Sequence, residues 1–210
     1  MIGKVGLALL TAVSLAACQP SAPDNAKASE EQPPVRTAVI ATAAPFINTD
    51  AGIRAVFPVG ARVCEALSGD SPQGFYTRLG DDRMTCVPAR DPPKVSSMVI
   101  LATYNSAFYR RMDEVIGSDC PKLNPKEADG RTLGFPGIEA TVCESGKPDG
   151  DIEISVNAFA GSWEEEPGRM APHMIYSAYL LTTTATETTD RVTFQRFLDQ
   201  VRLTPPVPAT

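Results

Sequence analysis

Four of the five cysteines limit most strongly what this 210-residue chain can fold into. Cys64, Cys86, Cys120 and Cys143 are an even number at well-separated positions, and in an exported protein such a set predicts two disulfides with three possible pairings. We favour Cys64–Cys86 and Cys120–Cys143, because each pair closes one local loop between neighbouring elements. A zinc site is the alternative, but no Cys-x-x-Cys occurs and His173 is the only histidine, so we expect no metal and no cofactor.

Export is inferred from residues 1–17. Lys4 gives a positive start, and an apolar run too short to span a bilayer follows it. The run ends in Leu-Ala-Ala-Cys at 15–18, which resembles the lipobox of bacterial lipoproteins. The resemblance implies cleavage before Cys18, lipid on its thiol and, with Gln19 next, an outer-membrane location facing the periplasm. A plain secretory signal with a chance cysteine is the alternative.

Composition divides the rest of the chain into three parts. Residues 18–45 are rich in Ala, Pro, Ser and Glu, which predicts a flexible tether. A single domain is expected at 46–203, and a proline-rich, loose tail at 204–210. The net charge of −6 shows no basic footprint for nucleic acid, and it suits a basic partner or a neutral ligand better.

The first half of the domain predicts short strands and then a helix. Strands are expected at 53–57, 61–66 and 75–79, and an apolar run predicts a strand at 95–103 that is buried on both faces. The spacing of apolar residues predicts a helix over 105–116, with Gly117 as its C-cap. Arg110 and Arg111, near Tyr104 and Tyr109, would form the solvated outer face of that helix.

The second half predicts antiparallel strands. Polar and apolar residues alternate at 138–142 and 152–158, and 174–184 is apolar on both faces, as in a central strand. A last helix is expected at 190–203, with Thr189 or Asp190 as its N-cap. Both helices need a sheet face to cover, so we predict an α+β domain, with an antiparallel sheet and two main helices packed on it.

This order of elements resembles the PsbP/Mog1-type fold over roughly residues 50–203. The closing segment at 194–203 is similar in style to the helix that ends many such domains. The resemblance is one of topology, and it implies a domain that binds partners rather than catalyses.

The segment 161–173 joins two predicted strands and is long for a hairpin connection. A tryptophan beside three glutamates could form an aromatic anchor with an acidic rim, which suits a basic protein partner. The candidate partner-binding residues are Trp163, Glu164, Glu165, Glu166 and His173. A solvated loop with Trp163 tucked onto the domain is the alternative, and His173 alone indicates a local hydrogen bond rather than catalysis.

We therefore expect a binding protein, and one version is an inhibitor or immunity protein for a toxin or an envelope hydrolase. No catalytic residue is assigned, because Gly69-Asp70-Ser71 resembles the nucleophile block of GDS-type esterases but lacks the family's histidine motif and reads as a turn. One alternative is a carboxylate-dependent envelope hydrolase. Its candidate acids and bases are Asp81, Asp82, Glu139 and Glu153. Another is a small-ligand or assembly lipoprotein.

Overall fold

The computed structural model describes residues 39–40, 44–68, 71–81, 83–86, 95–117, 120, 133–146 and 150–206. The expected signal segment at 1–17, the expected lipidation site Cys18 and most of the expected tether lie outside these residues. Across the described ranges, no helix is both long enough and apolar enough to cross a membrane.

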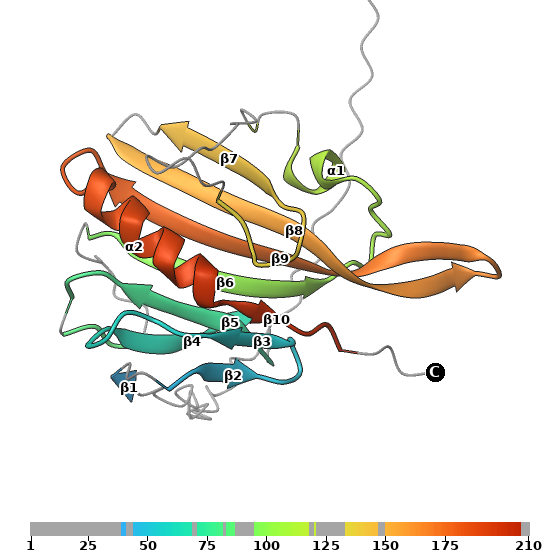
Figure 1. Cartoon of the computed structure of the whole chain (residues 1–210), viewed down its shortest axis with the longest axis horizontal. Coiled ribbons are helices and arrows are strands. Elements are labelled where there is room, and N and C mark those ends of the chain that lie inside the picture. The colour runs from blue at the N-terminus through green and yellow to red at the C-terminus, as the bar shows by residue number, and fades with distance from the viewer. Residues whose placement is uncertain are drawn as a thin grey trace, which may run out of the picture. The chain divides into compact units, whose positions relative to one another are not determined.

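The described strands form two antiparallel sheets (Figure 1). The larger sheet has the order β1-β4-β5-β6-β9-β8-β7, and the smaller has the order β10-β3-β2. The strands of the larger sheet are β1 (Val39–Ile40), β4 (Arg62–Ser68), β5 (Ser71–Arg78), β6 (Ser97–Tyr104), β7 (Thr141–Gly146), β8 (Asp151–Glu166) and β9 (Arg169–Thr183). The other elements are β2 (Phe46–Asn48), β3 (Ile53–Ala55), β10 (Arg202–Leu203) and the helices α1 (Met112–Ile116) and α2 (Glu187–Gln200).

Helix α2 covers one face of the larger sheet, and the alternation along the central strands explains why. Successive side chains of a strand point to opposite faces, so every second residue of β8 and β9 faces α2. The buried residues of this interface are Ile154, Val156, Ala178 and Leu180 of the sheet and Phe194, Phe197 and Leu198 of the helix. The prediction of an antiparallel sheet is confirmed, and the domain holds more sheet than expected.

The strand expected at 174–184 as a central one lies between β6 and β8 as β9, whereas the expectation that 95–103 is buried on both faces is wrong. Along β6, buried residues alternate with partly exposed ones, and the same alternation runs along most of β9. The reason is that α2 covers only one face of the sheet. The opposite face, which includes Ser177 and Tyr179, stays partly open.

The helix expected at 105–116 is only the five residues of α1, with Gly117 confirmed as its C-cap at φ 76°. In a longer helix the Tyr109 N–H would bond the Asn105 carbonyl. It bonds the Asn105 side chain Oδ1 instead, at 2.9 Å, and Asn105 Nδ2 donates to the Tyr109 carbonyl at 2.8 Å. Phe108 has φ 57°, which is outside the right-handed helical region. The Asn105 side chain therefore competes with the helix and replaces its first turn.

The last helix begins and ends three residues earlier than expected. Thr186 is its N-cap, so Thr189 and Asp190 lie inside the helix. Asp190 is buried and accepts hydrogen bonds from the hydroxyls of Ser96, at 2.5 Å, and Thr182, at 2.7 Å. It therefore links α2 to the sheet, and the chain beyond the helix pairs with β3 as β10.

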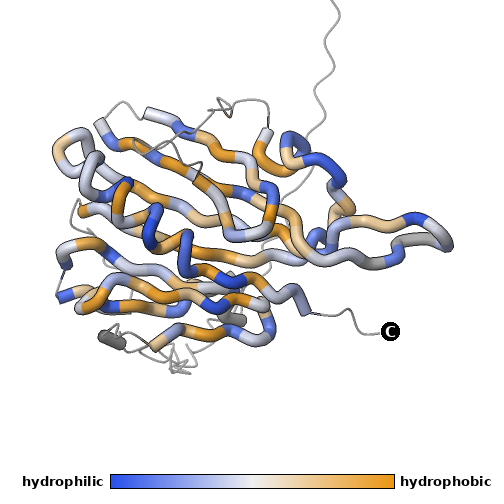
Figure 2. Tube along the Cα trace, viewed as in Figure 1, coloured by the Kyte–Doolittle hydropathy of each residue, from blue (hydrophilic) through white to orange (hydrophobic). Residues whose placement is uncertain are grey.

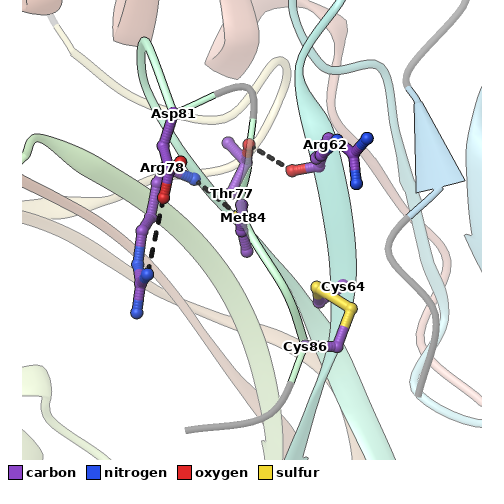
Figure 3. Close-up of a disulfide and its surroundings, with 7 residues drawn as sticks. All are labelled: Arg62, Cys64, Thr77, Arg78, Asp81, Met84 and Cys86. Carbon is purple, nitrogen blue, oxygen red and sulfur yellow. Dashed lines mark hydrogen bonds and ion pairs between the residues drawn. A yellow bond between two sulfur atoms is a disulfide. The ribbon is translucent and has the colours of Figure 1, made fainter. Parts of the chain in front are cut away.

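The expected disulfides Cys64–Cys86 and Cys120–Cys143 are both confirmed, with Cα–Cα distances of 5.5 and 5.4 Å. Figure 3 shows the first, which joins β4 to the segment after β5. The same segment is held by the Arg78 N–H, which donates to Met84 Sδ at 3.2 Å, and by an Arg78–Asp81 ion pair at 3.5 Å.

Residues just outside both ends of the expected domain contact its strands. Val39 and Ile40, placed in the tether by composition, pair with β4 as the edge strand β1. The start of the tail is attached to the domain, since the Thr204 N–H donates to the Gly52 carbonyl at 2.8 Å. A Cβ at Gly52 would lie 2.1 Å from the Thr204 oxygen, so only glycine permits this approach.

Candidate functional site

Strands β8 and β9 extend well beyond their neighbours and form a projecting arm (Figure 1). Pairing with β7 stops at Asn157, and pairing with β6 stops at Met174. We call residues 161–173, where the two strands have no other neighbour in the sheet, the β8–β9 arm. At about 3.4 Å per residue, its outgoing strand, 161–166, measures roughly 20 Å.

The loop expected at 161–173 is therefore a hairpin. Its strands are paired from Ser162–Pro172 to Glu166–Arg169, which leaves only Pro167 and Gly168 as the turn. Gly168 has φ 79°, as the third residue of a type II turn requires. The sequence indicated a loop because the glutamate run and the prolines lack the apolar alternation by which strands are recognised.

The tip of the arm is exposed and acidic. Glu164 is exposed, and its Oε1 accepts the Gly168 N–H at 2.6 Å, which fixes the turn. A bulge lies between Glu164 and Glu166. For Trp163, Glu165 and Glu166 the structure describes the backbone only, and Trp163 pairs with Ala171. In Figure 2 the tip lacks the strongly hydrophobic segments that run through the central sheet.

The base of the arm is braced along its β9 edge by the segment 105–110. The Asn105 N–H donates to the His173 carbonyl at 2.9 Å, and Asn105 Nδ2 donates to the Pro172 carbonyl at 2.9 Å. Arg110 Nη1 donates to the Met170 carbonyl at 3.0 Å. An isolated two-stranded hairpin is only marginally stable in water. These bonds act in place of a third strand and hold the arm in position.

The C-terminal segment packs against the same base. His173 Nδ1 lies 3.0 Å from the Pro206 carbonyl oxygen, and its ring centroid lies 5.4 Å from that of Tyr104. A Cβ at Gly161 would lie 2.9 Å from Pro205 Cβ. His173 is only 5% exposed, so it serves the packing of the arm, and we remove it from the candidate partner-binding residues.

Large apolar side chains are exposed next to this brace. We call the set Tyr104, Phe108, Tyr109 and Met170 the aromatic base; these residues are 55%, 37%, 37% and 52% exposed. A bulky residue with positive φ, such as Phe108 here, is uncommon, and such backbone strain clusters at functional sites. The sequence analysis missed this set because it interpreted Arg110 and Arg111, near Tyr104 and Tyr109, as the solvated outer face of a helix.

The carboxylates proposed for an enzyme do not converge in the described residues. Asp81 pairs with Arg78, Glu153 lines a cavity under α1, and Asp82 lies outside the description. Glu139 lines a different cavity beside Asp199.

The described residues also contain no group of three His, Cys, Asp or Glu side chains that could hold a metal ion. Comparison with known proteins found no matching family model, no matching curated protein and no matching solved structure.

Proposed function

We propose that this chain is a membrane-anchored lipoprotein of the cell envelope that binds a basic protein partner through the β8–β9 arm. The observation that carries the proposal is an exposed, acidic hairpin that is braced at its base. Because the arm is already held in one conformation, it loses little conformational entropy on binding, and this favours affinity. One concrete version is an inhibitor or immunity protein whose arm enters the basic cleft of a toxin or an envelope hydrolase.

Charge supports a basic partner. Three consecutive glutamates, Glu164 to Glu166, lie in the distal part of β8, and the whole chain has a net charge of −6. Complementary charge speeds encounter and excludes wrong partners, whereas buried aromatic residues supply most of the binding energy. The aromatic base offers tyrosine, phenylalanine and methionine beside Arg110, a composition that is enriched at interfaces.

Two observations support the envelope location. The Leu-Ala-Ala-Cys run at 15–18 has the lipobox form, and two disulfides suit an oxidising compartment. Mass spectrometry of the mature protein tests the anchor. We expect an acylated N-terminal Cys18, and a Cys18→Ser variant should lose the acyl mass and leave the membrane fraction.

The arm is tested by site-specific photocrosslinking in the producing cell. A photoreactive residue at Ser162 or Glu164 should capture a partner with a basic surface, whereas the same residue at Val192, exposed on α2, should not. The captured protein is then purified, and its affinity for arm variants is measured.

The decisive variant reverses Glu164, Glu165 and Glu166 to lysine, and it should weaken binding at least about tenfold. Its matched control reverses three exposed acids away from the arm, so that both variants change the net charge equally. The control residues are Asp50, Glu65 and Glu139. Glu164→Gln keeps an acceptor for the Gly168 N–H, and so separates charge from the shape of the turn. Equal affinity of the arm variant and its control would refute the role of the arm.

A further inference from the structure

A polar cavity lies on the sheet face turned away from α2. Its volume is about 340 Å³, at the lower end of the range for ligand pockets. The side chains that line it come from α1, from the Cys120–Cys143 disulfide and from three neighbouring strands, β7, β8 and β9. The polar lining residues are Ser145, Glu153, Ser155, Asn157, Ser177 and Tyr179.

The polar residues form one compact group on adjacent strands. Ser155 lies opposite Tyr179, and Asn157 lies opposite Ser177. Asn157 is 2% exposed and Ser155 is 9% exposed, which is deep for an amide and a hydroxyl. On β6, the residues opposite Tyr179 and Ser177 are the apolar Val99 and Leu101.

Burying such groups costs free energy unless they have hydrogen-bond partners. Asn157 Nδ2 donates to Ser155 Oγ at 3.0 Å. Asn157 Oδ1 and the hydroxyls of Ser177 and Tyr179 have no hydrogen-bond partner among the described residues. They are not buried atoms, since Gln195 Oε1 is the only described side-chain atom that is both buried and unpartnered. They line the cavity, where an amide oxygen and two hydroxyls are available to a bound molecule.

The side chains that line the cavity indicate which chemical class of molecule it binds. Among the described residues no lysine, arginine or histidine lines the cavity, so these residues offer an anion no countercharge. Glu153 lines the cavity and also interacts with another group of the protein. Hydroxyls and an amide both donate and accept, whereas Val115 and Ile116 offer an apolar wall. A sugar ring matches both parts of this lining, because it has hydroxyls at its edge and C–H groups on its faces.

We propose that this cavity binds a neutral saccharide of one or two rings, held by Asn157, Ser177 and Tyr179 against the wall formed by α1 and the disulfide. The site lies apart from the arm, and the proposal does not depend on the proposed partner.

The test is saturation-transfer NMR, followed by titration calorimetry, on the full chain purified in detergent. The probes are glucose, maltose, N-acetylglucosamine, its β-1,4-linked disaccharide and, as an anionic counterpart, glucose 6-phosphate. We expect at least one neutral sugar to bind and glucose 6-phosphate not to bind. Asn157→Leu and Ser177→Val should each reduce the affinity at least about tenfold. The control, Ser162→Ala on the arm, should bind as the unmodified protein does.

Stability gives a second and independent readout. If the polar group serves a ligand, Asn157→Leu and Ser177→Val should raise the melting temperature of the sugar-free protein by about 2–4 °C each. The proposal is overturned if no neutral sugar binds at millimolar concentration, or if the sugar binds both variants as it binds the unmodified chain. It is also overturned if both variants melt lower, since the polar group then serves the fold.

Discussion

At the scale of single residues, Tyr176 shows how one buried hydroxyl joins the two sheets. Its side chain is fully buried in β9, and the hydroxyl donates to the Ala51 carbonyl, just before β3, at 2.9 Å. Burial raises the pKa of Tyr176 from its ordinary value of 10.0 to about 12, and the nearby Tyr104 adds a smaller effect in the same direction. The folded protein therefore keeps this proton at a pH where the unfolded chain loses it.

We predict that Tyr176→Phe lowers the free energy of unfolding near neutral pH by about 1–3 kcal/mol, because the Ala51 carbonyl loses its donor. The folded pKa lies above the unfolded one, so the contribution is complete below pH 10 and is lost as the pH rises towards 12. In that window the unmodified protein should lose about 1.4 kcal/mol more per pH unit than the variant. Urea unfolding of both proteins on either side of pH 10 measures the difference. Parallel pH profiles would contradict the assignment.

At the scale of elements, strands that alternate over a buried face were predictable, whereas elements decided by one side chain were not. The strand at 152–158 was recognised because Ile154 and Val156 face α2 and their neighbours do not. The prediction of a helix at 105–116 was wrong because the Asn105 side chain accepts a hydrogen bond from the Tyr109 N–H. The spacing of apolar residues gives no information about such a bond. The hairpin of the arm was not predicted for a related reason. Its distal strands cover no core, so their sequence shows no alternation of apolar and polar residues.

The brace of the arm is testable at this scale. Asn105→Ala removes the side-chain bonds to the Pro172 carbonyl and to both backbone groups of Tyr109. We predict a loss of about 1–3 kcal/mol in stability, and faster hydrogen–deuterium exchange in peptides covering 169–174. The exposed neighbour Ser106→Ala is the control and should leave exchange unchanged. Unchanged exchange in both variants would mean that the arm is rigid without the brace.

At the scale of the whole molecule, the disulfides that close short loops were predictable, whereas the pairing of strands far apart in the sequence was not. The disulfide pairing followed from two short, separate loops, with sequence separations of 22 and 23 between the paired cysteines. The pairing of β6 with β9 joins Ser97 to Leu181, and nothing local to either strand indicates it. The polar cavity depends on that same remote assembly. Its residues lie on neighbouring strands of the folded sheet, and single serines and an asparagine in the sequence gave no sign of a site.

The two disulfides should contribute independently, because their loops do not overlap in the sequence. In the chain-entropy account, closing a loop of this size stabilises the fold by about 3 kcal/mol. Small domains have a net stability of about 5–15 kcal/mol, so losing both crosslinks would remove a large part of it. We predict that Cys64→Ala with Cys86→Ala, and Cys120→Ala with Cys143→Ala, each cost about 3 kcal/mol, and that the fourfold variant costs their sum. Urea unfolding of the four proteins measures this, with the unmodified protein under reductant expected to match the fourfold variant. A fourfold variant as stable as the unmodified chain would show that packing alone holds the fold.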